Sequence, residues 1–72
     1  MIKIDTKEEF KRVLLGVMET IKEVKEIPSG HLYAQLMRFV DIDLQTYQGM
    51  IEIMVDIGFI EVENHLIIYK GK

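Results

Sequence analysis

The stretch DIDLQTYQGMIEIMVDIGFI, from Asp41 to Ile60, decides the fold that we expect for this chain. Asp43 is a good helix N-cap because its carboxylate can accept a hydrogen bond from a free amide of the first turn. Ile42 and Tyr47 have the spacing of a hydrophobic staple around that cap. Gly58 can take the positive φ with which a chain leaves a helix. The stretch therefore predicts a helix that begins after Asp43 and runs into a strand.

Two further helical segments precede this one. Apolar residues recur at helical spacing from Phe10 to Val24, which is typical of an amphipathic helix. Thr6 and Glu9 have the spacing of a capping box at its start. Pro28 ends the segment, because a proline pushes the residue before it out of helical geometry. Ser29 is then the expected cap of a second, shorter helix.

The remaining segments show β patterns. After Gly58, two short apolar runs around Asn64 predict an antiparallel hairpin, the wing, over about 59–69. The alternation of Ile2 and Ile4 near the N-terminus fits either a short strand or an extended arm. We therefore expect a single α+β domain over 1–72, with three helices and a short hairpin. Whether the N-terminal segment adds a strand or remains an extended arm is not decided by the pattern. The expected helices span about 6–25, 29–39 and 43–57.

Composition narrows the class of protein. The chain has 72 residues, of which 49% are hydrophobic, no cysteine and a formal net charge of -3. These values suit one small packed core that is held without disulfides or thiolate metal sites. No apolar run approaches the ~20 residues that a membrane-spanning helix needs, and the charged N-terminus differs from a signal peptide. We therefore expect a cytoplasmic protein with no membrane partner.

Part of the chain, from about Pro28 to Tyr69, resembles winged helix-turn-helix domains, those of the MarR-like proteins in particular. The resemblance is carried by the capped helix with its following Gly58-Phe59-Ile60, and by Leu32-Tyr33-Ala34 with Met37 in the helix before it. In that family the third helix enters the DNA major groove and the wing touches phosphates. The resemblance implies a small winged helix. Its implied DNA-facing residues, with cations from the first helix, are Gln45, Thr46, Gln48, Gly49, Asn64, His65, Lys11 and Arg12.

The distribution of charge argues against that use of the third helix and wing. No Lys or Arg occurs between Arg38 and Lys70, whereas this stretch holds six carboxylates. Neutralisation of phosphates by cations supplies most non-specific affinity for DNA. An acidic surface without cations would repel a duplex unless the first helix or a partner chain brought basic residues close. A DNA-binding regulator is therefore our alternative hypothesis.

The third helix is apolar over a wider arc than a core stripe requires. At 100° per residue, Leu44, Tyr47, Ile51, Met54 and Val55 form the expected core face, and other apolar residues form a flank beside it. The flank is either covered by the first helix and the wing or exposed as a protein-binding patch. Our leading hypothesis is a non-enzymatic module that acts through protein–protein contact, as a homodimer or with another protein. Its expected interface residues are Leu15, Met50, Ile53 and Ile57.

The sequence predicts no catalytic site, metal site or cofactor. His31 and His65 lack the neighbouring ligands that zinc requires. Ser29 lies close to His31, but the local pattern suits a helix cap better than a nucleophile and its base. The five glycines are isolated from one another, so no phosphate-binding loop is expected. We therefore expect that the protein is not an enzyme.

Overall fold

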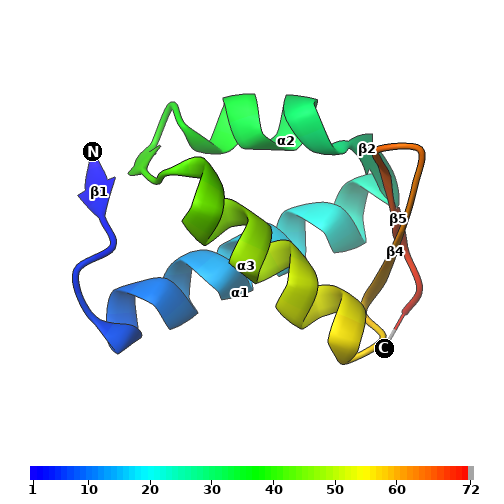
Figure 1. Cartoon of the computed structure of the whole chain (residues 1–72), viewed down its shortest axis with the longest axis horizontal. Helices are drawn as coiled ribbons and strands as arrows, with labels where there is room; N and C mark the ends of the chain where they lie inside the picture. Colours follow the sequence, from blue (N-terminus) through cyan, green and yellow to red (C-terminus); the bar gives the residue numbers. More distant parts are fainter. Residues whose placement is uncertain (72) are drawn as a thin grey trace.

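Three helices and five short strands make up the computed structural model, which describes residues 1–71. Helix α1 (Lys7–Val24) crosses α3 (Leu44–Asp56), and α2 (Ser29–Leu36) lies along the top of the molecule in the view of Figure 1. The three predicted helices are confirmed, although α2 ends three residues before the expected position 39. The chain is thus a small α+β protein, as the sequence predicts.

The strands form two separate ladders. Strands β2 (Glu26–Pro28), β5 (Leu66–Tyr69) and β4 (Ile60–Glu63) make an antiparallel sheet in that order. Strands β1 (Ile2–Lys3) and β3 (Val40–Asp41) pair in parallel, so the N-terminal segment is a strand. The predicted hairpin is confirmed, but β2 was not expected from the sequence. It forms because it pairs with β5, which places Ile27 opposite Ile67 and buries both side chains.

Local signals at the helix ends are largely as expected. The Thr6 hydroxyl accepts a hydrogen bond from the Glu9 amide at 3.1 Å, and the Asp43 carboxylate accepts one from the Thr46 amide at 2.7 Å. Gly58 has a φ of 79° after α3. The expected capping role of Ser29 is wrong, because α2 begins without a side-chain cap. The Ser29 side chain is engaged elsewhere.

Ser29 takes part in a small polar network that joins α2 to α3. The Tyr47 hydroxyl donates to the Ser29 carbonyl oxygen at 2.9 Å, and the Ser29 hydroxyl lies 3.2 Å from that of Tyr47. The rings of Tyr47 and Tyr33 lie 4.8 Å apart, and the Tyr33 hydroxyl donates to the Ile42 carbonyl. Burial raises the pKa of Tyr47, so this hydroxyl stays protonated and remains a donor.

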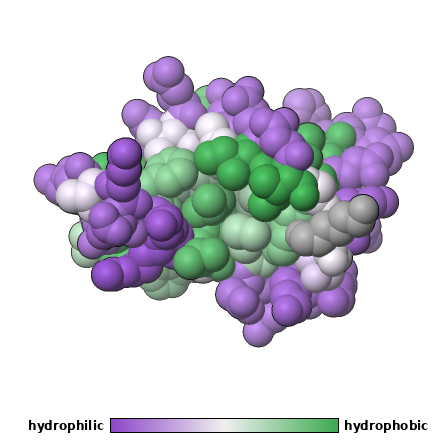
Figure 2. All heavy atoms as spheres, turned by 90° about the horizontal axis from the view of Figure 1, so that it is seen from below, coloured by the Kyte–Doolittle hydropathy of each residue, from purple (hydrophilic) through white to green (hydrophobic). Residues whose placement is uncertain are grey.

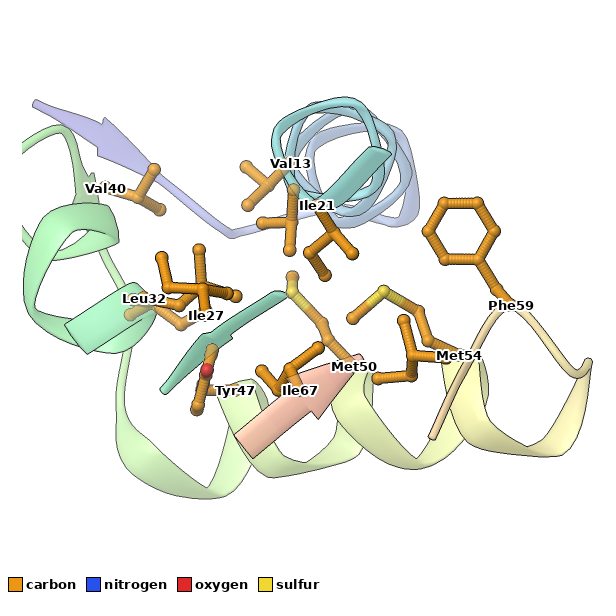
Figure 3. Packing of buried hydrophobic residues seen from close by; sticks show 13 residues of the cluster. Val13, Ile21, Ile27, Leu32, Val40, Tyr47, Met50, Met54, Phe59 and Ile67 are labelled. Atoms are coloured by element: carbon orange, nitrogen blue, oxygen red, sulfur yellow. The ribbon is translucent and has the colours of Figure 1, made fainter. Parts of the chain in front are cut away.

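The core is a single apolar cluster to which all three helices contribute (Figure 3). Its most deeply buried side chains are Ile21 of α1, Met50 and Met54 of α3, and Ile67 of β5. The buried line of α3 is therefore Tyr47, Met50 and Met54. The other core residues are Val13, Val17, Ile27, Leu32, Val40, Ile42, Phe59 and Ile60.

The expected core face of α3 is partly wrong. Leu44 and Val55 are about half exposed, whereas Met50 is completely buried. Both faces fit the same amphipathic pattern, because apolar residues cover more than half the circumference of this helix. Packing against α1 and the sheet selects the orientation in which the flexible methionine side chains fill the interior. Relative to expectation, α3 is rotated about its axis toward Met50.

The tyrosine network predicts a specific stability effect. Tyr47→Phe leaves the Ser29 carbonyl without its donor in a half-buried position, and we expect the free energy of unfolding to fall by about 1–2 kcal/mol. Tyr69→Phe is the control, since the Tyr69 hydroxyl makes no side-chain hydrogen bond within residues 1–71. Urea denaturation followed by circular dichroism measures both. Equal losses in the two variants would contradict the assigned role.

The cap of α3 predicts a dependence on pH. Hydrogen bonds from the side chain and amide of Thr46 lower the pKa of Asp43 from its ordinary value of 3.8. A lowered pKa means that the ionised group stabilises the folded state above pH 4, and that this contribution is lost as the pH falls through the folded-state pKa. Asp43→Asn should therefore differ from the wild type most near pH 7, and the difference should shrink below pH 4. Thermal unfolding of both chains, measured from pH 7 to below pH 4, checks this predicted change in the stability difference.

Candidate protein interface on α3

The outer surface of α3 and the β4–β5 hairpin is where the two functional hypotheses can be compared. Gln45, Gln48, Glu52 and Asp56 are exposed along α3. At 100° per residue these four positions lie on the side of the helix opposite the buried line. The DNA hypothesis and the protein-contact hypothesis both use this side of the molecule, so its chemistry distinguishes them.

The structure spreads the implied DNA-facing residues over several places. Gln45 and Gln48 are exposed, whereas Thr46 and Gly49 are half-buried, and the Thr46 amide is already bound to Asp43. Asn64 and His65 form the hairpin turn with φ values of 51° and 65°. The turn prediction for Asn64 is therefore confirmed. His65 shares the left-handed conformation, which the sequence did not indicate.

The basic residues of α1 are not gathered at α3. Arg12 borders a groove whose other lining residues come from β1, β3, α1, α2 and the turn after α2, and none comes from α3. Its nearest acidic partner is Glu9, at 3.7 Å. Lys11 precedes Arg12 on the same helix and is exposed. Within one chain, Arg12 therefore does not offset the carboxylates of α3.

The hairpin has the same acidic character as α3. Glu61 and Glu63 are exposed on β4, and the Lys70 ammonium lies 3.2 Å from the Glu61 carboxylate. That exposed pair contributes little stability, but it engages a cation that follows the hairpin directly in the sequence. The helix and hairpin thus present carboxylates where a winged-helix DNA reader requires positive charge.

The four expected interface residues have different environments. Met50 is completely buried in the core, so its assignment to the interface is wrong: a side chain without exposed surface cannot contact a partner. Ile53, Ile57 and Leu15 are exposed, with 38%, 55% and 55% of their surface accessible. The hypothesis that the whole apolar flank of α3 is covered by α1 and the hairpin therefore holds for Met50 but not for the two isoleucines.

Ile53 and Ile57 lie one helical turn apart and form the α3 patch. Seen from below, hydrophobic atoms gather in a band surrounded by polar ones (Figure 2). The N-terminal half of α1 and the C-terminal end of α3 lie on that side of the molecule (Figure 1). On α1, Phe10, Leu14 and Met18 are only partly buried. A contiguous apolar surface with a polar rim is typical of a protein interaction site.

Leu15 belongs to another part of the surface. It follows Val13 by two residues, so it points away from the core on the outer side of α1. A partner that contacted Leu15 would use this outer side of α1. Sequence analysis also missed the opposite flank of α3, where Leu44 and Val55 are exposed, because it assigned both to the core. No periodicity signal separates the two orientations of this helix.

The polar side chains that sequence analysis considered as metal ligands or nucleophiles all lie within residues 1–71. Within residues 1–71, no group of three His, Cys, Asp or Glu side chains could hold a metal ion. The His31 ring lies 3.2 Å from the Gln35 amide, and the Ser29 hydroxyl faces Tyr47. Among the helices described for residues 1–71, none is long and apolar enough to cross a membrane.

Comparison with known proteins returns no family model, curated protein or solved structure that matches this chain.

The difference in burial between Met50 and Ile53 predicts different losses in the free energy of unfolding when each residue is replaced by alanine. Met50→Ala removes a completely buried side chain and should lower the free energy of unfolding by about 2–5 kcal/mol. Ile53→Ala removes a partly exposed side chain and should cost less than about 1 kcal/mol in the monomer. Chemical denaturation at low protein concentration compares them. Similar losses would show that the orientation of α3 differs from that described.

Proposed function

We propose that this chain is a winged-helix module that acts through protein–protein contact and forms a homodimer. The order of elements supports the winged-helix part: α1, β2, α2, α3 and then the β4–β5 hairpin, with β2 joining the hairpin as its third strand. This is the arrangement expected of a wing that packs beside a helix-turn-helix unit. The chain adds a short parallel ladder, β1 with β3.

The observation that carries the functional proposal is the chemistry of α3. Its exposed surface combines Ile53 and Ile57 with Glu52 and Asp56, and it has no cation. Burying two exposed isoleucine side chains against apolar surface stabilises a complex, at roughly 25 cal/mol per Å² removed from water. Bringing the same surface to a polyanion would instead set carboxylates against phosphates. The α3 patch therefore favours another polypeptide over DNA.

A second copy of the chain is the simplest partner for this surface. Two identical patches can meet across a two-fold axis, because each then supplies the complement of the other. A stable interface covers about 800 Å² per partner, and the chain exposes 5059 Å² in all. The α3 patch alone is too small for this. The interface would extend over the neighbouring part of α1, where Phe10 and Leu14 are half-buried.

A DNA-binding regulator is the second candidate, and the element order favours it. In that case Gln45 and Gln48 would contact bases, and the hairpin turn at Asn64 and His65 would approach the backbone. Phosphate contacts would fall to Lys11 and Arg12, and Arg12 borders a groove that no residue of α3 lines. Such binding would therefore need a second chain to bring Arg12 to the duplex.

Self-association is tested by light scattering coupled to size-exclusion chromatography. The wild-type chain should elute with twice its mass of 8.4 kDa, and Ile53→Glu should elute as a monomer, because a carboxylate would be buried in the interface. Leu44→Glu is the matched control: an exposed apolar residue on the other flank of the same helix, expected to leave the dimer intact. A monomeric wild type would remove the homodimer proposal.

The DNA alternative predicts a different signature. It requires retention on random duplex DNA at low salt that declines steeply as salt is added. It also requires that Arg12→Gln weaken this retention. We expect no such retention for the wild-type chain, measured by fluorescence anisotropy of a labelled duplex. Salt-sensitive binding that Ile53→Glu does not change would favour the regulator over the protein-contact module.

A further inference from the structure

A second apolar surface lies on the other side of α1. It is a groove of about 270 Å³ between α1, α2 and the β1–β3 ladder. Its floor is formed by the buried side chains of Val13, Val17, Leu32 and Val40. Figure 3 shows Val13, Leu32 and Val40 pointing toward a common space. The exposed ring of Phe39 stands at its rim. None of its lining residues belongs to the α3 patch.

Gly16 keeps this groove open. It lies in the middle of α1 and lines the groove, and a Cβ added there would meet no atom within 4 Å. Glycine in a helix interior costs about 1 kcal/mol relative to alanine, and no close contact of the backbone requires it here. A larger side chain at this position would instead occupy the groove. The helix thus has an unfilled space where a better helix former would fit.

Among residues 1–71, Arg12 is the only charged residue that lines the groove. Its side chain is 73% exposed, and its ion pair with Glu9 is long, at 3.7 Å. An exposed pair of this length is weak, so the guanidinium can turn to another anion. Gln35 and Thr20 also line the groove, but the Thr20 hydroxyl already donates to the Gly16 carbonyl. The lining of the groove is therefore mainly apolar, with a single cation at its edge.

We infer that this groove binds a small aliphatic carboxylate, with the hydrocarbon chain against Val13, Val17 and Leu32 and the carboxylate paired with Arg12. Sites for small ligands are concave, mostly apolar and carry a few polar groups that orient the ligand. A guanidinium matches a carboxylate in both charge and bidentate geometry. At ~30 Å³ per water-sized unit, the groove accommodates a chain of about eight to ten carbons.

The inference does not depend on the proposed dimer. The groove and the α3 patch share no residue. On α1, the groove residues Val13 and Gly16 lie on a different side of the helix from Leu14 and Met18. Binding can therefore be measured in the Ile53→Glu chain, where self-association through α3 is removed. Failure of ligand binding in that chain would leave the dimer proposal standing, and failure of the dimer would leave the groove intact.

The test is a titration of the full ¹⁵N-labelled chain with decanoate below its micelle concentration, followed by amide chemical shifts. We expect saturable shifts confined to the groove, at Gly16, Val17, Leu32 and Val40. Decanol, which has the same chain without the charge, should bind about tenfold more weakly. Equal binding of decanoate and decanol would overturn the pairing with Arg12. Absence of shifts at the groove amides would overturn the site.

Two pairs of variants locate the ligand. Gly16→Leu fills the groove and improves helix propensity, so the chain should stay folded and lose decanoate binding. Lys22→Leu, which adds the same side chain at an exposed position of α1 outside the groove, should bind normally. Arg12→Gln should weaken decanoate about tenfold and leave decanol unchanged, whereas Lys11→Gln removes a neighbouring charge without effect. Retained binding in Gly16→Leu would contradict the proposal.

Other occupants of the groove give different results in the same experiment. If a second copy of the chain covered the groove, its amides would shift on dilution of the ligand-free Ile53→Glu chain, and decanoate would bind more weakly at high protein concentration. If decanoate bound at scattered apolar surface, shifts would appear equally at Ile57 and Leu15, which are exposed and do not line the groove. Either result would overturn the inferred carboxylate site.

Discussion

One packing contact supports the rest of this small structure: Met50 and Met54 of α3 against Ile21 of α1 and Ile67 of β5. All four side chains are completely buried. The chain has no cysteine and no metal cluster within residues 1–71, so apolar burial must offset the conformational entropy of folding. Because α1, α3 and the sheet all contribute to this contact region, it sets how each helix is rotated and thereby which side chains reach the surface.

The surface chemistry follows from that rotation. With Met50 inside, Ile53 and Ile57 lie on one flank of α3, while Leu44 and Val55 lie on the other. The outward side between them carries Glu52 and Asp56. The exposed surface of α3 thus combines isoleucines with carboxylates. Electrostatics and apolar exposure both support the proposed protein contact over the DNA alternative.

Helix α1 separates two apolar surfaces of different character. On the side of α3, hydrophobic atoms form an open face (Figure 2) that suits a broad contact with another chain. On the side of α2, Gly16 and Val13 border a narrow concave groove with Arg12 at its edge. Curvature distinguishes the two: a broad face suits a macromolecule, whereas a groove of about 270 Å³ suits a small ligand. One helix therefore supports two proposals that rest on separate side chains.

What the sequence alone determined is local. Thr6 and Asp43 act as caps and Gly58 and Asn64 take left-handed turns, because each signal depends on atoms within about four residues of itself. The tertiary structure alone decided the features that join distant residues. Strand β2 exists through pairing with residues some forty positions later. The burial of Met50 and the groove beside Arg12 depend on how α1, α2 and α3 pack. Periodicity specifies that a helix is amphipathic, but when apolar residues cover most of its circumference, only its neighbours select the side that is buried.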